Sequence, residues 1–201
     1  IVTQSNRAGG IIRRVRDFAQ RRQPRLEIVD VNKSVREVLD LLHTTIRHAG
    51  VETAIDLALD LPAVRGDVIQ LEQVLVNLMR NAVEAMLGCD PDHRRLTVRT
   101  EAPSLEVAAV TVSDTGPGMD DKIMSRVFEP FFTTKDNGLG IGLSISRSII
   151  EAHRGHLSVA PSEEGGCAFT FTLPASRSAA GEAPCNDEEE ALSRDVLMGK
   201  P

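Results

Sequence analysis

VTVSDTGPG, residues 110–118, is the stretch that decides the fold, because an apolar strand pattern runs directly into a glycine-rich turn. A carboxylate at a strand end, here Asp114, can accept a hydrogen bond from the exocyclic amine of a planar ring. Gly116 and Gly118 let the backbone approach such a ring closely and adopt angles that other residues avoid. Alone, the pattern D-x-G-x-G also describes an ordinary turn, so its neighbours decide its meaning.

A second glycine run, GLGIG at residues 138–142, opens a predicted helix. Free amides at a helix N-terminus, reached through Gly138, Leu139, Gly140 and Gly142, form a natural cradle for phosphate. The spacing differs from G-x-G-x-x-G, and the sequence G-x-x-x-x-G-K-[ST] occurs nowhere in the chain. Taken alone, such a run is more often only a glycine-rich helix cap.

Two asparagines, Asn77 and Asn81, lie four residues apart in a predicted helix over 68–87 and therefore share one face, which Glu84 continues. A side-chain amide oxygen is a hard, neutral ligand that suits Mg²⁺, a cation that also takes oxygens from nucleotide phosphates. A solvated helix face is the commoner meaning of such a pair.

The segment FEPFFTTKDN, residues 128–137, connects the two glycine-rich stretches. Three phenylalanines are too apolar for a free loop, so we expect part of the segment to dock on the core. Lys135 stands just before the phosphate cradle and could reach a phosphate. The polar residues after it suggest mobility, which is typical of a lid over a bound nucleotide.

Outward from these motifs, periodicity and turn residues divide the chain into helices and strands. The predicted helices are 8–22, 31–48, 68–87 and 141–153, and the predicted strands are 51–59, 96–101, 106–113, 156–160 and 167–173. Helices and strands do not alternate regularly, which disfavours a doubly wound parallel sheet. We therefore expect an α+β fold, a two-layer sandwich with a mixed, mostly antiparallel sheet.

Composition excludes several classes of protein. The net charge of −6 argues against nucleic acid as the main partner. Three cysteines without a C-x-x-C pair argue against a disulfide framework or a zinc site. No apolar run approaches the ~18 residues that span a bilayer, so we expect no membrane contact in this stretch and a cytoplasmic location, with the anchoring of a parent protein left open. The chain starts without Met, as a fragment would.

The four motifs occur together and in order, at residues 77–82 (NLMRNA), 114–118 (DTGPG), 128–132 (FEPFF) and 138–143 (GLGIGL). This ordered set resembles the N, G1, F and G2 boxes of the histidine kinase ATP-binding domain, in the Bergerat-fold (GHKL) superfamily. Residues 165–174, GGCAFTFTLP, are similar to its closing glycine motif and last strand. The resemblance covers about 29–174, and the phrases NAVEAM, FTTK and LSISR look closest to FixL-like, PAS-linked kinases.

The resemblance implies ATP and Mg²⁺ as cofactors, and it implies a role for each matching residue. The implied site contains Asp114, Gly116, Gly118 and Thr170 (or Thr172) for adenine, Lys135, Gly138, Leu139, Gly140 and Gly142 for the phosphates, and Asn81 for Mg²⁺ with Asn77 beside it. Asn77, Asn81 and Lys135 would act in catalysis.

Two positions depart from the family pattern. Many relatives carry a basic residue where this chain has Glu84, and an acid there cannot offset phosphate charge. Relatives that hydrolyse ATP carry a glutamate base where this chain has Asn77, and an amide cannot accept a proton from water. The second departure favours transfer to a side chain over hydrolysis.

The resemblance further implies phosphorylation of a histidine on the first helix of a dimeric hairpin, with relay to the receiver domain of a response regulator. We expect residues 1–25 to be the second hairpin helix, 26–175 the catalytic domain and 176–201 a disordered tail or linker, with homodimerisation through the hairpin. None of the five histidines is followed by an acid, so the acceptor is expected upstream of Ile1. The alternatives are a Bergerat-fold ATPase, an anti-sigma-type serine kinase and a degenerate nucleotide-binding module.

Overall fold

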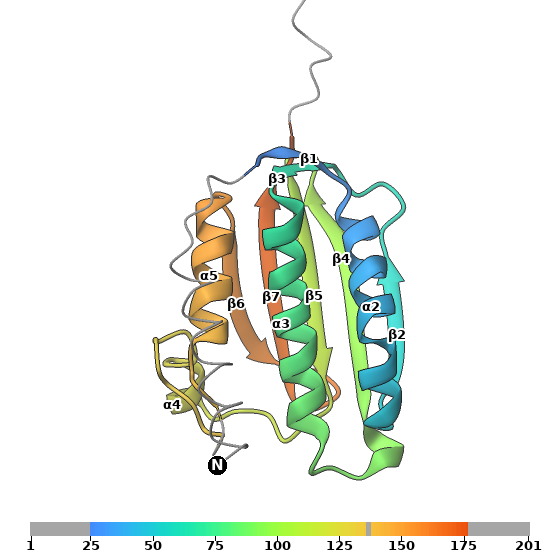
Figure 1. Cartoon of the computed structure of the whole chain (residues 1–201), viewed down its shortest axis with the longest axis vertical. Coiled ribbons are helices and arrows are strands. Elements are labelled where there is room, and N and C mark those ends of the chain that lie inside the picture. The colour runs from blue at the N-terminus through green and yellow to red at the C-terminus, as the bar shows by residue number, and fades with distance from the viewer. Residues whose placement is uncertain (1–24, 136–137, 177–201) are drawn as a thin grey trace, which may run out of the picture.

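A computed structural model describes residues 25–135 and 138–176, which form a sheet with helices packed on one of its faces (Figure 1). The expected helix over 8–22 and the tail beyond Ser176 lie outside the described residues. Among the helices of the described ranges, none is both long and apolar enough to cross a membrane.

The large sheet has five strands in the order β2-β4-β5-β7-β6. These strands are β2 (Glu52–Leu57), β4 (Arg95–Ser104), β5 (Val107–Asp114), β6 (His156–Pro161) and β7 (Cys167–Pro174). β2 pairs with β4 in parallel, and the other pairs are antiparallel. The helices are α2 (Val31–His48), α3 (Val68–Met86), the short α4 (Asp121–Met124), α5 (Gly142–Ala152) and the 3₁₀ turn η1 (Pro91–His93). The predicted α+β sandwich with a mixed, mostly antiparallel sheet is confirmed.

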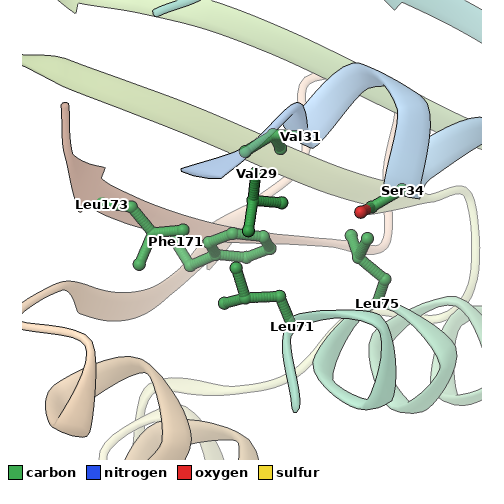
Figure 2. Close-up of a pocket in the computed structure, with 7 residues that line it drawn as sticks. All are labelled: Val29, Val31, Ser34, Leu71, Leu75, Phe171 and Leu173. Atoms are coloured by element: carbon green, nitrogen blue, oxygen red, sulfur yellow. The ribbon is translucent and has the colours of Figure 1, made fainter. Parts of the chain in front are cut away.

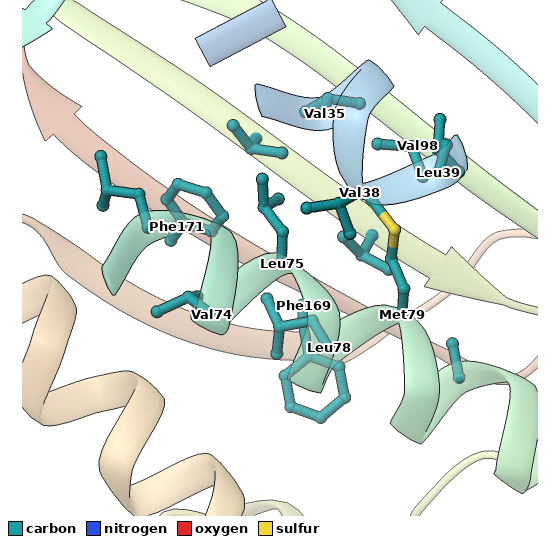
Figure 3. Packing of buried hydrophobic residues seen from close by; sticks show 14 of the residues in the cluster. Val35, Val38, Leu39, Val74, Leu75, Leu78, Met79, Val98, Phe169 and Phe171 are labelled. Atoms are coloured by element: carbon teal, nitrogen blue, oxygen red, sulfur yellow. The ribbon is translucent and has the colours of Figure 1, made fainter. Parts of the chain in front are cut away.

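Helix α3 lies across the middle of the sheet and supplies the centre of the core (Figure 3). Its apolar side chains recur every three or four residues, so they form one stripe that faces the sheet. Leu75, Leu78 and Met79 are completely buried, beside Val38 of α2 and Phe171 of β7. This packing fixes the helix whose other flank carries the two asparagines.

A second sheet, of β1 (Glu27–Val29) and β3 (Val64–Gly66), pairs antiparallel at one end of the molecule. Neither strand is among those predicted from the sequence, because three-residue strands are too short to show alternation. Figure 2 shows the apolar gap beneath this sheet, which is lined by Val29, Val31, Ser34, Leu71, Leu75, Phe171 and Leu173. The gap has no room for a water molecule, so it belongs to the core.

The start of α3 is tied to the end of α5. Asp67 caps α3, since its Oδ1 accepts a hydrogen bond from the Gln70 N–H at 3.2 Å. The Asp67 N–H in turn donates to Nε2 of the buried His153 at 2.9 Å. Nδ1 of His153 lies 2.8 Å from the Ile149 carbonyl oxygen. His153 is therefore a packing residue that links the two helices.

Candidate nucleotide-binding site

Asp114 ends β5 with its side chain on the helix-covered face, and it is only 4% exposed. Its Oδ1 accepts hydrogen bonds from the backbone N–H groups of Gly116, at 2.9 Å, and Cys167, at 3.4 Å. Burial raises the pKa of Asp114, and these two bonds together with the charge of Lys135 oppose the rise only in part. The structure thus holds a carboxylate in a place that disfavours its charge.

The second oxygen of Asp114 is the one available to a ligand. Among the described residues, every fully buried side-chain nitrogen or oxygen has a hydrogen-bond partner. Oδ2 has no such partner there, so it is open to the surroundings rather than sealed in the core. A buried carboxylate with one satisfied and one open oxygen can recognise a neutral N–H donor.

Glycines surround this carboxylate because side chains would fill the same space. A Cβ on Gly116 would lie 2.8 Å from Oδ1 of Asp114 and 3.4 Å from the Ala85 Cβ of α3. A Cβ on Gly166 would lie 2.2 Å from the Asp114 carbonyl oxygen, and Gly166 also has a φ of +71°. Gly118, with a φ of +73°, faces Gly166. The glycines thus let the backbone pack against Asp114 where side chains would collide with it.

Asn77 joins α3 to the start of α5. Its Nδ2 donates to Oγ of the buried Ser146 at 3.0 Å. A Cβ on Gly142 would lie 2.5 Å from Oδ1 of Asn77, so a larger residue at position 142 would have to displace the Asn77 side chain. Asn81 lies one turn further along α3 on the same flank and is half-buried.

The N-terminus of α5 has free backbone donors. Ile141 stands at the N-cap and makes no capping hydrogen bond with its side chain. The first amides of this 11-residue helix are therefore available to an anion. Gly140 has a φ of +65°, and a Cβ there would lie 2.5 Å from the Phe132 carbonyl oxygen. The glycine run thus meets the phenylalanine segment backbone to backbone.

The phenylalanine segment docks in part, as expected. Phe128 packs edge to face against Phe169 of β7, with ring centroids 6.3 Å apart. The Phe131 N–H donates to the Gly140 carbonyl oxygen at 2.8 Å, while the Phe131 side chain is 79% exposed. The Arg126 guanidinium lies over the ring of Phe132, 4.4 Å from its centroid.

Lys135 lies over the C-terminal half of α3. Its Nζ is 2.8 Å from Oε2 of Glu84, and Arg80 lies 3.2 Å from Oε1 of the same carboxylate. Burial by itself raises the pKa of Glu84, but the hydrogen bonds and charges of Lys135 and then Arg80 outweigh it, so the pKa is lowered. The Glu84 carboxylate therefore points toward Lys135, and its negative charge is balanced by Lys135 and Arg80.

Thr170 does not join this group. Cys167, Phe169 and Phe171 of β7 are buried toward the helices, so Thr170 points to the opposite face of the sheet. There its Oγ1 lies 2.9 Å from Oγ1 of Thr111. Asp114 faces the helices, and the expected approach of Thr170 or its alternative Thr172 to the same ring is thus not supported by the geometry.

Three residues at the site were not among the site residues predicted from the sequence. Gly166 and Cys167 meet Asp114 because β5 and β7 pair, although about fifty positions separate them in the chain. Burial and the nearby Asp114 charge raise the pKa of the Cys167 thiol to about 11, so the thiol stays protonated. Ser146 accepts a hydrogen bond from Asn77. Its place one turn after Gly142 did not by itself predict that contact.

The fold and this geometry define a nucleotide-binding α+β sandwich, and comparison with known proteins identifies its family. Residues 66–177 match the family described as "Histidine kinase-, DNA gyrase B-, and HSP90-like ATPase". The match covers more than half of the chain, so the chain belongs to this family.

Curated relatives place the chain among sensor kinases. It is 43% identical over 171 residues to the C4-dicarboxylate transport sensor protein DctS of Rhodobacter capsulatus, which covers 85% of this chain and 26% of the relative. It is also 43% identical over 172 residues to the sensor protein FixL of Bradyrhizobium diazoefficiens, covering 86% of this chain and 34% of the relative. The chain thus spans about a quarter to a third of the length of these relatives.

A solved structure agrees. The catalytic domain of histidine kinase ThkA is 31% identical, with a TM-score of 0.67, and the match covers 75% of this chain and 95% of that one. The chain therefore contains the ATP-binding catalytic domain of a sensor histidine kinase.

Proposed function

We propose that this domain binds ATP through the residues described above and donates the γ-phosphoryl group to a histidine on a hairpin helix. The observation that supports it best is the arrangement along α3. Asn77 meets the free N-terminus of α5, and Ala85, two turns later, meets Gly116 beside Asp114. One helix thus sets the distance between a carboxylate for the base and amides for the phosphates.

Asp114 recognises the base in this proposal. Its open Oδ2 accepts a hydrogen bond from the exocyclic amine of adenine, while Gly116, Gly118 and Gly166 place no side chain beside the carboxylate. The solved structure of full-length ShkA, 28% identical over 79% of this chain with a TM-score of 0.68, is a complex with AMPPNP, an ATP analogue. The adenine assignment carries over from this likeness and from the open oxygen.

The phosphates lie between α3 and α5 in this proposal, and the donor set fits Mg²⁺. The described residues hold no cluster of three or more His, Cys, Asp or Glu side chains that could bind a metal alone. Mg²⁺ takes most of its ligands from phosphate and water, so the amide oxygen of Asn81 suffices. When bound, the ion would neutralise charge on the phosphate oxygens.

Positioning is the chemistry left to the protein. The amides of the glycine run, at Gly138, Leu139, Gly140 and Gly142, hold the phosphates, with Lys135 nearby, so that an imidazole can attack in line. Asn77 donates to Ser146 and has no group that accepts a proton from water. The site therefore favours transfer over hydrolysis.

The likeness to known kinases also guides the proposed partners. The structure of histidine kinase ThkA has been solved in complex with response regulator TrrA. ThkA in that complex is 27% identical to the present chain, with a TM-score of 0.72, and the match covers 87% of the present chain and 49% of the ThkA chain. We accordingly propose that the phosphoryl group is relayed to a receiver domain. In this proposal residues 26–175 are the catalytic domain, and residues 1–25 are one of the hairpin helices through which the protein forms a homodimer. We further propose a cytoplasmic location.

Phosphate incorporation tests the proposed function. A longer protein that includes the upstream hairpin helix should incorporate label from γ-labelled ATP, in an acid-labile and base-stable form. Asp114→Asn should abolish incorporation, whereas Asp56→Asn, which breaks an exposed ion pair with Arg99 on the open face, should not. Acid-stable label would indicate a hydroxyl acceptor, and release of phosphate without labelling would indicate an ATPase.

A further inference from the structure

Glu84 is an acid on the helix flank that would face phosphates, which calls for an explanation. It lies three residues after Asn81, so both side chains are on neighbouring positions of one α3 face. An unpaired carboxylate there would repel phosphate. The structure shows that the carboxylate is paired at both oxygens.

The two pairs differ in kind. Arg80 is a neighbour on the same helix, and its contact with Oε1, at 3.2 Å, leaves Oε2 facing away from it. Lys135 comes from the connection between β5 and α5, 51 positions along the chain, and approaches Oε2 at 2.8 Å. Arg80 thus helps to aim a carboxylate oxygen at a cation that arrives from another segment.

Lys135 is also close enough for its charge to act on Asp114. That charge opposes the burial that raises the pKa of Asp114. The charge of the ammonium group therefore acts both on the acid of α3 and on the acid that we assign to adenine.

We propose that Glu84 competes with nucleotide for Lys135: its carboxylate holds the Lys135 ammonium group in the ligand-free domain, and phosphate oxygens replace the carboxylate when nucleotide binds. This inference rests on the proposed role of Lys135 in binding phosphate. The side chains of Glu84 and Lys135 are 39% and 42% exposed, so the pair is solvated and weak. A weak pair yields the lysine to a more highly charged partner.

Only ligands that carry phosphate must displace Glu84 from Lys135, and this displacement lowers their affinity. Nucleotide must displace Glu84 from Lys135, so removing the carboxylate charge should tighten ADP and ATP binding about two- to fivefold, the range expected for an exposed ion pair. Adenosine has no phosphate, so its affinity should not change.

A double-mutant cycle tests this inference by calorimetry with adenosine, ADP and ATP at saturating Mg²⁺. Glu84→Gln should tighten ADP and ATP binding, and the gain should vanish when Lys135→Gln is also present. Glu151→Gln removes the same charge and breaks an ion pair of the same 2.8 Å length, with Arg147 near the far end of α5. That control should leave all three affinities unchanged.

The outcomes separate the inference from the proposed function. Unchanged or weaker ATP binding by Glu84→Gln contradicts the inference, as does a gain that persists without Lys135, because repulsion by the carboxylate alone would explain it. In both cases normal ATP binding by the wild-type chain leaves the proposed function standing. Absence of ATP binding by the wild-type chain overturns both.

Discussion

At the scale of single residues, Asp114 shows a conflict between ligand recognition and stability. Burial disfavours the ionised carboxylate, so the pKa of Asp114 is raised in the folded chain. A raised pKa means that the folded state prefers the protonated form. The folded state therefore loses stability as the pH rises from the ordinary value of 3.8 through the raised one, and the penalty is present in full above that.

Asp114→Asn should consequently stabilise the ligand-free domain at neutral pH while it removes ATP binding. An amide keeps an oxygen that accepts from Gly116 and Cys167, and it carries no charge to bury. Urea unfolding of both proteins at pH 7 and pH 4 measures the effect. The advantage of the variant should shrink at pH 4, and an equal advantage at both pH values would contradict the burial argument.

Asn81 is the residue on which the Mg²⁺ assignment depends. Asn81→Ala should weaken ATP binding in Mg²⁺ by about tenfold or more, as for loss of a metal-site partner, and leave binding in EDTA unchanged. Calorimetry in both buffers measures this. If the variant and the wild-type chain respond equally to Mg²⁺, Asn81 is not the ligand. Asn32, whose amide bonds to Ala58 and Thr100 away from the site, should retain the Mg²⁺ response when changed to Ala.

At the scale of elements, the cap of α3 carries more than its own helix. The carboxylate of Asp67 accepts from Gln70 and from the Arg25 N–H, while its backbone bonds to His153 at the end of α5. Asp67→Ala should therefore lower the free energy of unfolding by about 1–2 kcal/mol. Urea denaturation measures the loss, and Asp67→Ser, which keeps a capping oxygen, should recover most of it. Equal losses in both variants would exclude the cap as the cause.

The elements also show how far sequence reasoning could reach. Helix α3 was predicted nearly to its ends, because nineteen residues of periodic pattern leave little ambiguity. β1 and β3 were missed, because three residues carry no periodicity. Thr170 was assigned to adenine although the buried Phe169 and Phe171 on either side imply that it faces away. The contact of Asp114 with Cys167 depends on strand register, which one strand alone does not reveal.

At the scale of the whole molecule, the described ranges contain a hydrophobic core that joins α2, α3 and α5 to the sheet, and they contain both halves of the candidate site. A fragment of residues 25–176 should therefore fold alone, with the urea midpoint and ATP affinity of the full chain. Circular dichroism and calorimetry measure both quantities. A fragment that unfolds at lower urea, or binds ATP more weakly, would show that residues outside 25–176 contribute to the domain.

In the part of the chain that the structure describes, helices pack on one face of the sheet (Figure 1), and this arrangement also governs how sequence change is tolerated. Along β7, Phe169 and Phe171 point into the packed layer, and Thr170 and Thr172 point away from it. Truncating a buried phenylalanine costs about 3–5 kcal/mol, whereas most surface substitutions stay within about ±0.5 kcal/mol. Adjacent codons of one strand therefore face very different selection. Sequences descended from this gene should therefore differ mainly at every second position of a strand, where the side chain points away from the helices.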